Sequence, residues 1–454
     1  MSLADWWVRL RQRKALRASL YASAGQLGGY ALRLGSTIVL TRLLTPADYG
    51  LLAIAFATGV VLELMSDMGI RASIIRSEQS SDPLFLDTAW RIQRVRGLVL
   101  AMLTVLIGVV LLMAQQSGWL ASGSAVAAPS LPWLIMLNAL SPLILGHLPT
   151  KVYTANKELR LARIVAVDFF AQVGAVLTTL ILAYATGSVL AAVAGTVFGC
   201  LLRVLFSQRF IAGRANQSRF DRAAARQILH FGRWVVLSST LTALAFNGDR
   251  FLLAYWHDAT VLGQYAIALT FITLINQLVG KVVSTVALPQ ISQAKQIGEF
   301  EFKNTVSSAR RSYDVLCMTS AGLLFTGAPL LIHMLYDGRY QNAGPMLSIL
   351  SFSLVLAREE LYSSVYFATG KPQVLPLFSG LALFSLVVLV PIVHMWGGLQ
   401  ATLWMLALRH VLGLPVHYIL MARFGLNRWQ DEVLAVSFWA IGAAFGQCLT
   451  VLFR

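Results

Sequence analysis

Long apolar stretches, each close to the length of a membrane crossing, follow one another along almost the whole chain. A transmembrane helix needs about 20 consecutive apolar residues, and polar or charged turns separate the stretches at that spacing. The pattern therefore predicts an all-α polytopic membrane protein with about 13 transmembrane helices and no large soluble domain. The expected spans are 18–44, 47–68, 92–114, 130–150, 164–186, 188–207, 232–256, 262–288, 312–336, 345–369, 373–394, 397–421 and 433–453.

The composition agrees with this pattern, since 57% of the 454 residues are hydrophobic and only 12% are charged. The formal net charge of +16 would by itself also suit a nucleic-acid-binding protein. The lysines and arginines, however, gather in every second loop between the expected spans. This alternation predicts a cytoplasmic N-terminus, an outer C-terminus and no nucleic-acid partner. The basic segments are the N-terminus, 71–96, 151–163, 203–233, 281–311, Lys371 and 409–428.

The sequence lacks the motifs that would indicate an enzyme, a nucleotide site or a metal site. It contains no GxxxxGK[ST] loop for phosphates, no HExxH and no GxSxG. Cys200, Cys317 and Cys448 lie in or at apolar spans and form no CxxC pair, which favours core packing. The outer loops are short and nearly free of charge. We therefore expect a protein that is not an enzyme and that has no cofactor and no metal.

One motif occurs twice. RLLTPADYGLLAIA runs from Arg42 to Ala55, and RFLLAYWHDATVLGQYAIA runs from Arg250 to Ala268. An even number of expected spans lies between the copies, so both point the same way across the membrane, which predicts two lobes in a parallel repeat. Arginines that snorkel and tyrosines at the headgroup level are typical of scaffold or interface anchors. The anchor candidates are Arg42, Arg250, Tyr49, Gly50 and Tyr265.

Further motifs keep a fixed order around this repeat. DMGIRASIIR follows the second span, NGDRFLLAYW and LGQYAIA open the second half, and LPQIS closes the eighth span. In this order the chain resembles bacterial oligosaccharide flippases of the polysaccharide transporter group over roughly residues 15–420. The superfamily, named for multidrug, oligosaccharidyl-lipid and polysaccharide exporters, also holds multidrug extruders and peptidoglycan-precursor flippases. Its members commonly have twelve or fourteen spans, so a thirteenth span departs from the pattern.

The resemblance implies two six-helix lobes around a central cavity that opens alternately to each side of the bacterial cytoplasmic (inner) membrane. The cargo would be an undecaprenyl-pyrophosphate-linked oligosaccharide, turned to the outer leaflet for exopolysaccharide, lipopolysaccharide O-antigen or capsule synthesis. Expected partners are this lipid-linked oligosaccharide, membrane lipids, polysaccharide polymerase and glycosyltransferases, and the two-lobe plan works as a monomer. The expected parts are a cytoplasmic N-terminus (1–17), an N-terminal lobe (18–207), a basic linker (208–231), a C-terminal lobe (232–421) and an extra helix (422–454).

A stripe of polar side chains follows the first expected span. Gln26, Tyr30 and Arg33 are spaced by four and three residues, which places them on one face of a helix. An unpaired cation near the middle of a span costs roughly 2.5 kcal/mol or more, so Arg33 is a functional candidate. The stripe is expected to face the bundle or water, where the guanidinium can bind a pyrophosphate at two points.

Arg33 belongs to one lobe only, because Leu241 takes its place when the halves are aligned on Arg42 and Arg250. Residues that break the repeat are better functional candidates than residues that keep it. The alternative for Arg33 is an internal ion pair with Asp249 or Glu359.

The tenth span contains three charged residues in a row, Arg358, Glu359 and Glu360. Arg358 can hold phosphate, and Tyr362 shares a face with Glu359 and suits stacking on sugar; the alternative is a buried salt-bridge cluster. Lys281 is a further cavity candidate, although it lies toward a cytoplasmic end, where interface charges are common. The candidates for ion coupling or gating are Glu359, Glu360, Asp249, Glu63 and Asp67.

The basic segment from Gln208 to His230 has the charge to bind anionic headgroups and to form an interfacial helix, with a solvated linker as the alternative. Three transport functions stay open at this point: the oligosaccharide flippase, a cation-coupled multidrug exporter and a peptidoglycan lipid-precursor flippase. Arg33 favours an anionic cargo over a cationic drug, and the shortage of spans speaks against the peptidoglycan-precursor group.

Overall fold

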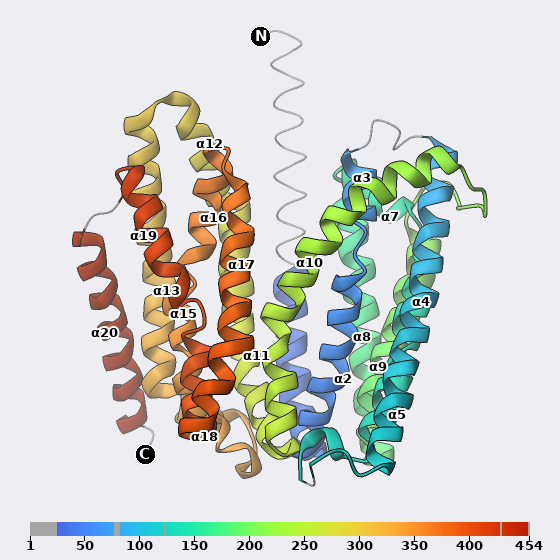
Figure 1. Cartoon of the computed structure of the whole chain (residues 1–454), viewed down its shortest axis with the longest axis horizontal. Coiled ribbons are helices and arrows are strands. Elements are labelled where there is room, and N and C mark those ends of the chain that lie inside the picture. The colour runs from blue at the N-terminus through green and yellow to red at the C-terminus, as the bar shows by residue number, and fades with distance from the viewer. Residues whose placement is uncertain (1–24, 77–81, 122, 427–428, 453–454) are drawn as a thin grey trace. The chain divides into compact units, whose positions relative to one another are not determined.

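The computed structural model describes residues 25–76, 82–121, 123–426 and 429–452, apart from the side chains of residues 231, 234, 358–360, 372 and 429. This part of the chain is helical and contains no strand, which confirms the predicted all-α class (Figure 1). The expected N-terminal segment 1–17 lies outside the described residues, and a cytoplasmic N-terminus stays a prediction.

The chain forms two compact units. Unit 1 comprises the chain up to Ala243 together with Leu253–Ala259, and unit 2 comprises Leu244–Leu252 together with the chain from Thr260 onward. Helix α10 (Arg222–Trp256) therefore supplies residues to both units. The segment 211–221, inside the expected linker 208–231, packs on the helices of unit 1.

Besides the first part of α10, the described part of unit 1 contains the helix at residues 25–43 and eight α-helices. They are α2 (Pro46–Met65), α3 (Ile70–Arg76), α4 (Pro83–Gln116), α5 (Leu131–Asn138), α6 (Leu140–Leu145), α7 (Lys151–Lys157), α8 (Leu161–Thr186) and α9 (Leu190–Phe210).

Within its described residues, unit 2 contains ten α-helices and two π-helical segments, Val283–Ala287 and Ser385–Leu389. The α-helices are α11 (Ala259–Val282), α12 (Leu288–Ile297), α13 (Glu299–Leu335), α14 (Ala343–Leu350), α15 (Phe352–Leu356), α16 (Arg358–Ala368), α17 (Leu375–Phe384), α18 (Val390–Ala407), α19 (Leu414–Arg423) and α20 (Trp429–Leu452).

Within the described residues, eight helices are long and apolar enough to cross a membrane, and the bent helix α10 would make a ninth. The sequence predicted about 13 spans, and several of the remaining ones are broken helices. The expected span 130–150 is divided into α5 and α6, where Pro142 has no N–H to donate to the preceding turn. The span 345–369 is divided into α14, α15 and α16, and at the last junction the Ala357 carbonyl accepts a hydrogen bond from the Tyr313 hydroxyl (2.6 Å). The thirteen crossings stay a prediction.

Local signals in the sequence explain where several helices begin. Thr45 caps α2 and exchanges hydrogen bonds with Asp48 in a capping box, with Pro46 in the first turn. Asp82 and Asp221 cap α4 and α10, where each carboxylate accepts one backbone N–H of the first turn. Gly398, with φ of 58°, interrupts α18 at the start of the span expected at 397–421.

The last helix, α20, runs along α13 in unit 2 (Figure 1). Glycines allow this close approach, because a Cβ on Gly322 would collide with the Trp439 carbonyl and a Cβ on Gly442 with the Thr319 carbonyl. Of the three cysteines expected to pack in a core, Cys317 is buried in unit 2 and Cys200 is half-buried. Cys448 is exposed on α20, so core packing is wrong for this residue.

Candidate functional site

The first copy of the repeated motif forms a corner between two helices of unit 1. The Tyr49 hydroxyl reaches back and donates a hydrogen bond to the backbone carbonyl of Thr37 (3.2 Å). Thr45 and Asp48 close the turn through the capping box, and Gly50 is buried behind it. Arg42 is exposed at this corner. These contacts fit the scaffold role that was expected for this motif.

The second copy forms a related corner in unit 2 with a different acceptor. Here the Tyr265 hydroxyl donates to the Asp249 carboxylate through a short hydrogen bond. Both side chains are buried, with 1% of Tyr265 and 2% of Asp249 exposed. The second carboxylate oxygen, Oδ1, has no hydrogen-bond partner among the described residues. Tyr265 is thus held inside the protein rather than exposed to headgroups, and Arg250 donates to Asn247 (2.5 Å) beside it.

The polar stripe of the helix at residues 25–43 lies apart from the face that packs on α8. Gly28 and Gly29 contact α8, where the Gln172 amide donates to the Gly29 carbonyl (3.1 Å). Gln26 and Arg33 are exposed, and Tyr30 is half-buried. Arg33 forms no ion pair with any side chain that the structure describes in unit 1. The three residues thus share one face of the helix, on which Gln26 and Arg33 are exposed and Tyr30 is half-buried, and their role in binding stays a prediction.

Lys281 lies in the last turn of α11, directly before the π-helical segment Val283–Ala287. Its side chain is half-buried, and its carbonyl accepts a hydrogen bond from the Thr285 hydroxyl (2.5 Å). Single π-helical turns inside α-helices are frequent at functional sites. This position keeps Lys281 among the candidates.

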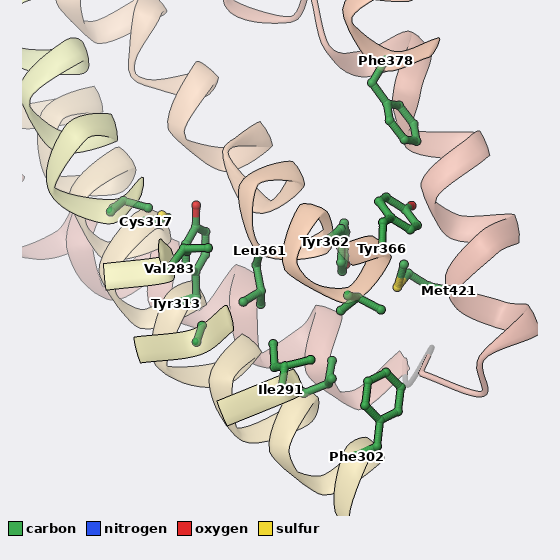
Figure 2. Packing of buried hydrophobic residues seen from close by; sticks show 14 residues of the cluster. Val283, Ile291, Phe302, Tyr313, Cys317, Leu361, Tyr362, Tyr366, Phe378 and Met421 are labelled. Carbon is green, nitrogen blue, oxygen red and sulfur yellow. The ribbon is translucent and has the colours of Figure 1, made fainter. Parts of the chain in front are cut away.

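Tyr362 of α16 is 9% exposed and belongs to the main hydrophobic cluster of unit 2 (Figure 2). Its ring packs against His417 of α19, with 5.3 Å between the ring centroids. Tyr366 in the next turn donates or accepts at His417 Nδ1 (2.8 Å), and the imidazole stacks on Phe378 with 3.6 Å between the centroids. These aromatic contacts are made inside the protein. Arg358, Glu359 and Glu360 open α16, and their side chains lie outside the described residues.

Glu63 and Asp67 lie at the end of α2 and the turn after it. The Arg96 guanidinium of α4 donates to the Glu63 carbonyl (2.6 Å) and to the Ser66 hydroxyl (2.9 Å), which ties α4 to this end. The Asp67 carboxylate accepts the backbone N–H of Gly69 (3.0 Å) and shapes the turn. A structural role therefore accounts for Asp67, whereas the exposed Glu63 carboxylate forms no ion pair within the described residues.

The structure reveals an ionic cluster between α13 and α20 that the sequence reasoning missed. Arg310, whose side chain is 5% exposed, pairs with Asp314 (3.6 Å) and with Glu432. Arg311 pairs with Asp431 (3.2 Å), whose side chain is 1% exposed. Two arginines and an acid within one turn of an apolar helix were a visible signal, but their partners on α20 are more than a hundred residues away. The described part of the chain contains no cluster of metal ligands.

A known protein family matches more than half of the chain. A family model described as polysaccharide biosynthesis protein matches residues 39–345. No curated protein sequence matches the chain.

Three solved structures illustrate the fold. The lipid II flippase MurJ in an inward closed conformation is 13% identical, with a TM-score of 0.67, and the match covers 96% of this chain and 100% of that one. An inward-facing multidrug resistance MATE family transporter of the MOP superfamily is 13% identical, with a TM-score of 0.63 and coverage of 93% and 95%. The eukaryotic MATE transporter AtDTX14 is 14% identical, with a TM-score of 0.58 and coverage of 94% and 99%. At these identities the likeness shows a shared transporter fold.

Proposed function

We propose that this chain, which belongs to the polysaccharide biosynthesis protein family, is a flippase that turns an undecaprenyl-pyrophosphate-linked oligosaccharide from the inner to the outer leaflet of the bacterial cytoplasmic membrane. It works by alternating access, is not an enzyme and supplies the outer face with repeat units for surface polysaccharide. The family and the transporter fold support membrane transport in polysaccharide biosynthesis, and the cargo is our inference from the residues.

The single observation that carries this proposal is the position of Arg33. It lies near the middle of an apolar helix, on an exposed face, with no ion pair in its own unit. An uncompensated cation at membrane depth is costly in lipid, so it is expected to face water or an anionic ligand. A pyrophosphate offers several oxygens to a guanidinium and is the anionic part of the proposed cargo.

The neighbouring side chains complete a binding surface for such a cargo. Tyr30 and Gln26 precede Arg33 by about one and two turns on the same face and offer a hydroxyl and an amide to sugar or phosphate oxygens. Unit 2, taken by itself, has its own binding candidates, which are Lys281 and, on α16, Arg358 and Tyr362. Asp249 is the favoured candidate for a coupling ion or proton, because its carboxylate is buried and keeps one oxygen without a hydrogen-bond partner.

The proposal is tested by following the lipid-linked oligosaccharide in cells that lack this protein. Wild type, Arg33→Ala and Arg33→Lys are reintroduced, and the fraction of lipid-linked sugar that a membrane-impermeant probe reaches at the outer face is measured. We expect wild type to restore exposure, Arg33→Ala to lower the rate by about tenfold or more, and Arg33→Lys to retain part of it. Arg163→Ala, which removes an exposed arginine at the start of α8, is the matched control and should behave as wild type.

Experiments on the same cells distinguish the proposed oligosaccharide flippase from the two alternative transporters. If the missing protein leaves the exposure of lipid-linked sugar unchanged, the cargo assignment is wrong. A rise in drug sensitivity would then favour a cation-coupled multidrug exporter, and a loss of outer-leaflet peptidoglycan precursor would favour the precursor flippase.

A further inference from the structure

The first turns of α10 form a basic pocket within unit 1. The pocket has a volume of about 480 Å³, and one wall consists of three arginines and a histidine, Arg222, Arg226, Arg233 and His230. These residues follow one another at steps of four, four and three, so they lie on one face of the helix. Arg222 and Arg226 are exposed, and neither forms an ion pair within the described part of the chain. Their charges are therefore not neutralised by neighbouring carboxylates.

The opposite face of the same turns is fixed to unit 1. Ala224 and Ile228 are buried in a hydrophobic cluster with Ile74 of α3 and with Phe85 and Ala89 of α4. Burial of this face determines which way the arginines point. The pocket is thus preorganised by packing and needs little side-chain ordering beyond the arginines themselves.

Hydrogen bonds also hold the segment that leads into α10. The Asp87 carboxylate accepts the backbone N–H of Gln217 (2.8 Å), and the Thr88 hydroxyl accepts that of Asp221 (2.9 Å). Asp221 uses its own carboxylate to cap α10 at Ala224 (2.8 Å). The expected solvated linker is therefore a fixed part of unit 1 at these positions.

A second anchor lies at the start of α7. The side-chain oxygen Oδ1 of Asn216 accepts the backbone N–H of Thr150 (2.9 Å), and the side-chain Nδ2 of Asn216 donates to the Thr150 hydroxyl (2.7 Å). The next residue, Lys151, is buried and donates to the Gln208 carbonyl (2.7 Å), and burial lowers the pKa of its ammonium group. The segment between α9 and α10 is thus bound to the same unit at several points.

The pocket has an apolar side as well as a basic one. Phe220 and Leu229 line it, and each is 47% exposed. The Arg91 guanidinium of α4 lies over the Phe220 ring, 5.2 Å from its centroid. Exposed apolar side chains beside unpaired arginines are typical of a surface at the membrane interface, where a headgroup meets acyl chains. A free inorganic phosphate would use only the arginines.

The net charge of the segment around the pocket also favours an anionic lipid headgroup as the ligand. The segment 208–233 carries six arginines and one aspartate, and that aspartate, Asp221, is engaged as the helix cap. The excess of positive charge also predicts that this segment faces the cytoplasm, where anionic lipids attract polybasic surfaces.

We propose that this pocket binds the phosphate headgroup of an anionic phospholipid, with Arg222 and Arg226 on the phosphate and Phe220 and Leu229 along the first part of the acyl chains. The site is separate from the cargo site around Arg33 and does not depend on the proposed cargo. Because α10 supplies residues to both units, a lipid in the pocket would act on the helix that connects them.

The test uses the full chain in nanodiscs and measures retained dioleoyl phosphatidylglycerol and dioleoyl phosphatidylethanolamine by native mass spectrometry. We expect wild type to retain phosphatidylglycerol preferentially and Arg222→Gln/Arg226→Gln to bind it about 30-fold more weakly, the combined effect of two arginine contacts. The control Arg163→Gln/Arg209→Gln removes the same charge from two exposed arginines outside the pocket and should lose less than about threefold. Equal losses in both variants, or equal retention of the two lipids, would overturn the proposal.

Two further measurements, hydrogen exchange and competition by other anions, test the pocket on the wild-type protein. On wild type, hydrogen exchange of residues 218–233 should slow at least about fivefold in phosphatidylglycerol compared with phosphatidylethanolamine, and unchanged exchange contradicts the site. Undecaprenyl phosphate and inorganic pyrophosphate are added as competitors. Displacement of phosphatidylglycerol only by excess anionic phospholipid supports the proposal, whereas preferential displacement by undecaprenyl phosphate assigns the pocket to the carrier lipid instead.

Discussion

Two arginines on apolar helices of this protein differ in their burial and in their ion pairs. Arg310 in unit 2 is buried and engages Asp314 on its own helix and Glu432 on α20. Arg33 in unit 1 is exposed and forms no ion pair within the described part of that unit. A paired charge is satisfied by the fold and stabilises one arrangement of helices, whereas an unpaired charge is left for a ligand. The contrast separates an arginine that the fold pairs with carboxylates from the one that we propose to bind the cargo.

The largest effect on stability is expected at the paired arginine. Arg310→Leu leaves Asp314 and Glu432 without their shared partner and should destabilise the protein by about 3–5 kcal/mol, the usual cost of breaking a buried pair on one side. Thermal unfolding of the purified protein measures the change. Adding Asp314→Leu and Glu432→Leu should recover part of the loss. If Arg310→Leu is as stable as wild type, the ionic cluster does not contribute to the stability of the protein.

The unpaired arginine should give the reverse pattern. Arg33→Ala is expected to slow transport by about tenfold to a hundredfold, since a charged hydrogen-bonded contact is worth about 1.5–3 kcal/mol. Its unfolding temperature should stay near that of wild type, because no protein partner is lost in its unit. Transport and thermal unfolding are measured for both variants. If Arg33→Ala and Arg310→Leu both lowered only stability, or both lowered only transport, the two arginines would not have different roles.

The two corners of the repeat differ in the same respect, because only the second corner contains a buried acid. Tyr265 donates to the buried Asp249 carboxylate, so Tyr265→Phe should cost about 2 kcal/mol of stability. A double-mutant cycle with Asp249→Asn checks that the loss comes from this pair. Additive effects of the two substitutions would contradict a direct coupling.

The smallest effect is expected at the first corner. Tyr49 donates to a backbone carbonyl and is partly exposed, so Tyr49→Phe should cost only about 0.5–1 kcal/mol. Thermal unfolding of Tyr49→Phe and Tyr265→Phe, measured under the same conditions, shows which substitution costs more stability. A loss at Tyr49 that equals the loss at Tyr265 would mean that the acid in the second corner adds no stability.

Much of the architecture followed from local information in the sequence. The apolar runs predicted helices, and Thr45, Asp82 and Asp221 marked where three of them begin. The spacing of Gln26, Tyr30 and Arg33 placed them on one face, which the described helix retains. The broken helices were harder to predict, because a break depends on whether a freed carbonyl finds a partner, as Ala357 does in Tyr313.

The helical class, the membrane character and the repeated motif could be predicted from the sequence, since these depend on residues close together in the chain. Which charges are paired depends on how the helices pack. Arg310 meets Glu432 across more than a hundred residues, and the fixed basic pocket at Arg222 and Arg226 depends on hydrogen bonds from α4 and α7. Side chains that are distant in sequence become partners only when helix packing brings them within a few ångströms, and no local pattern contains that distance.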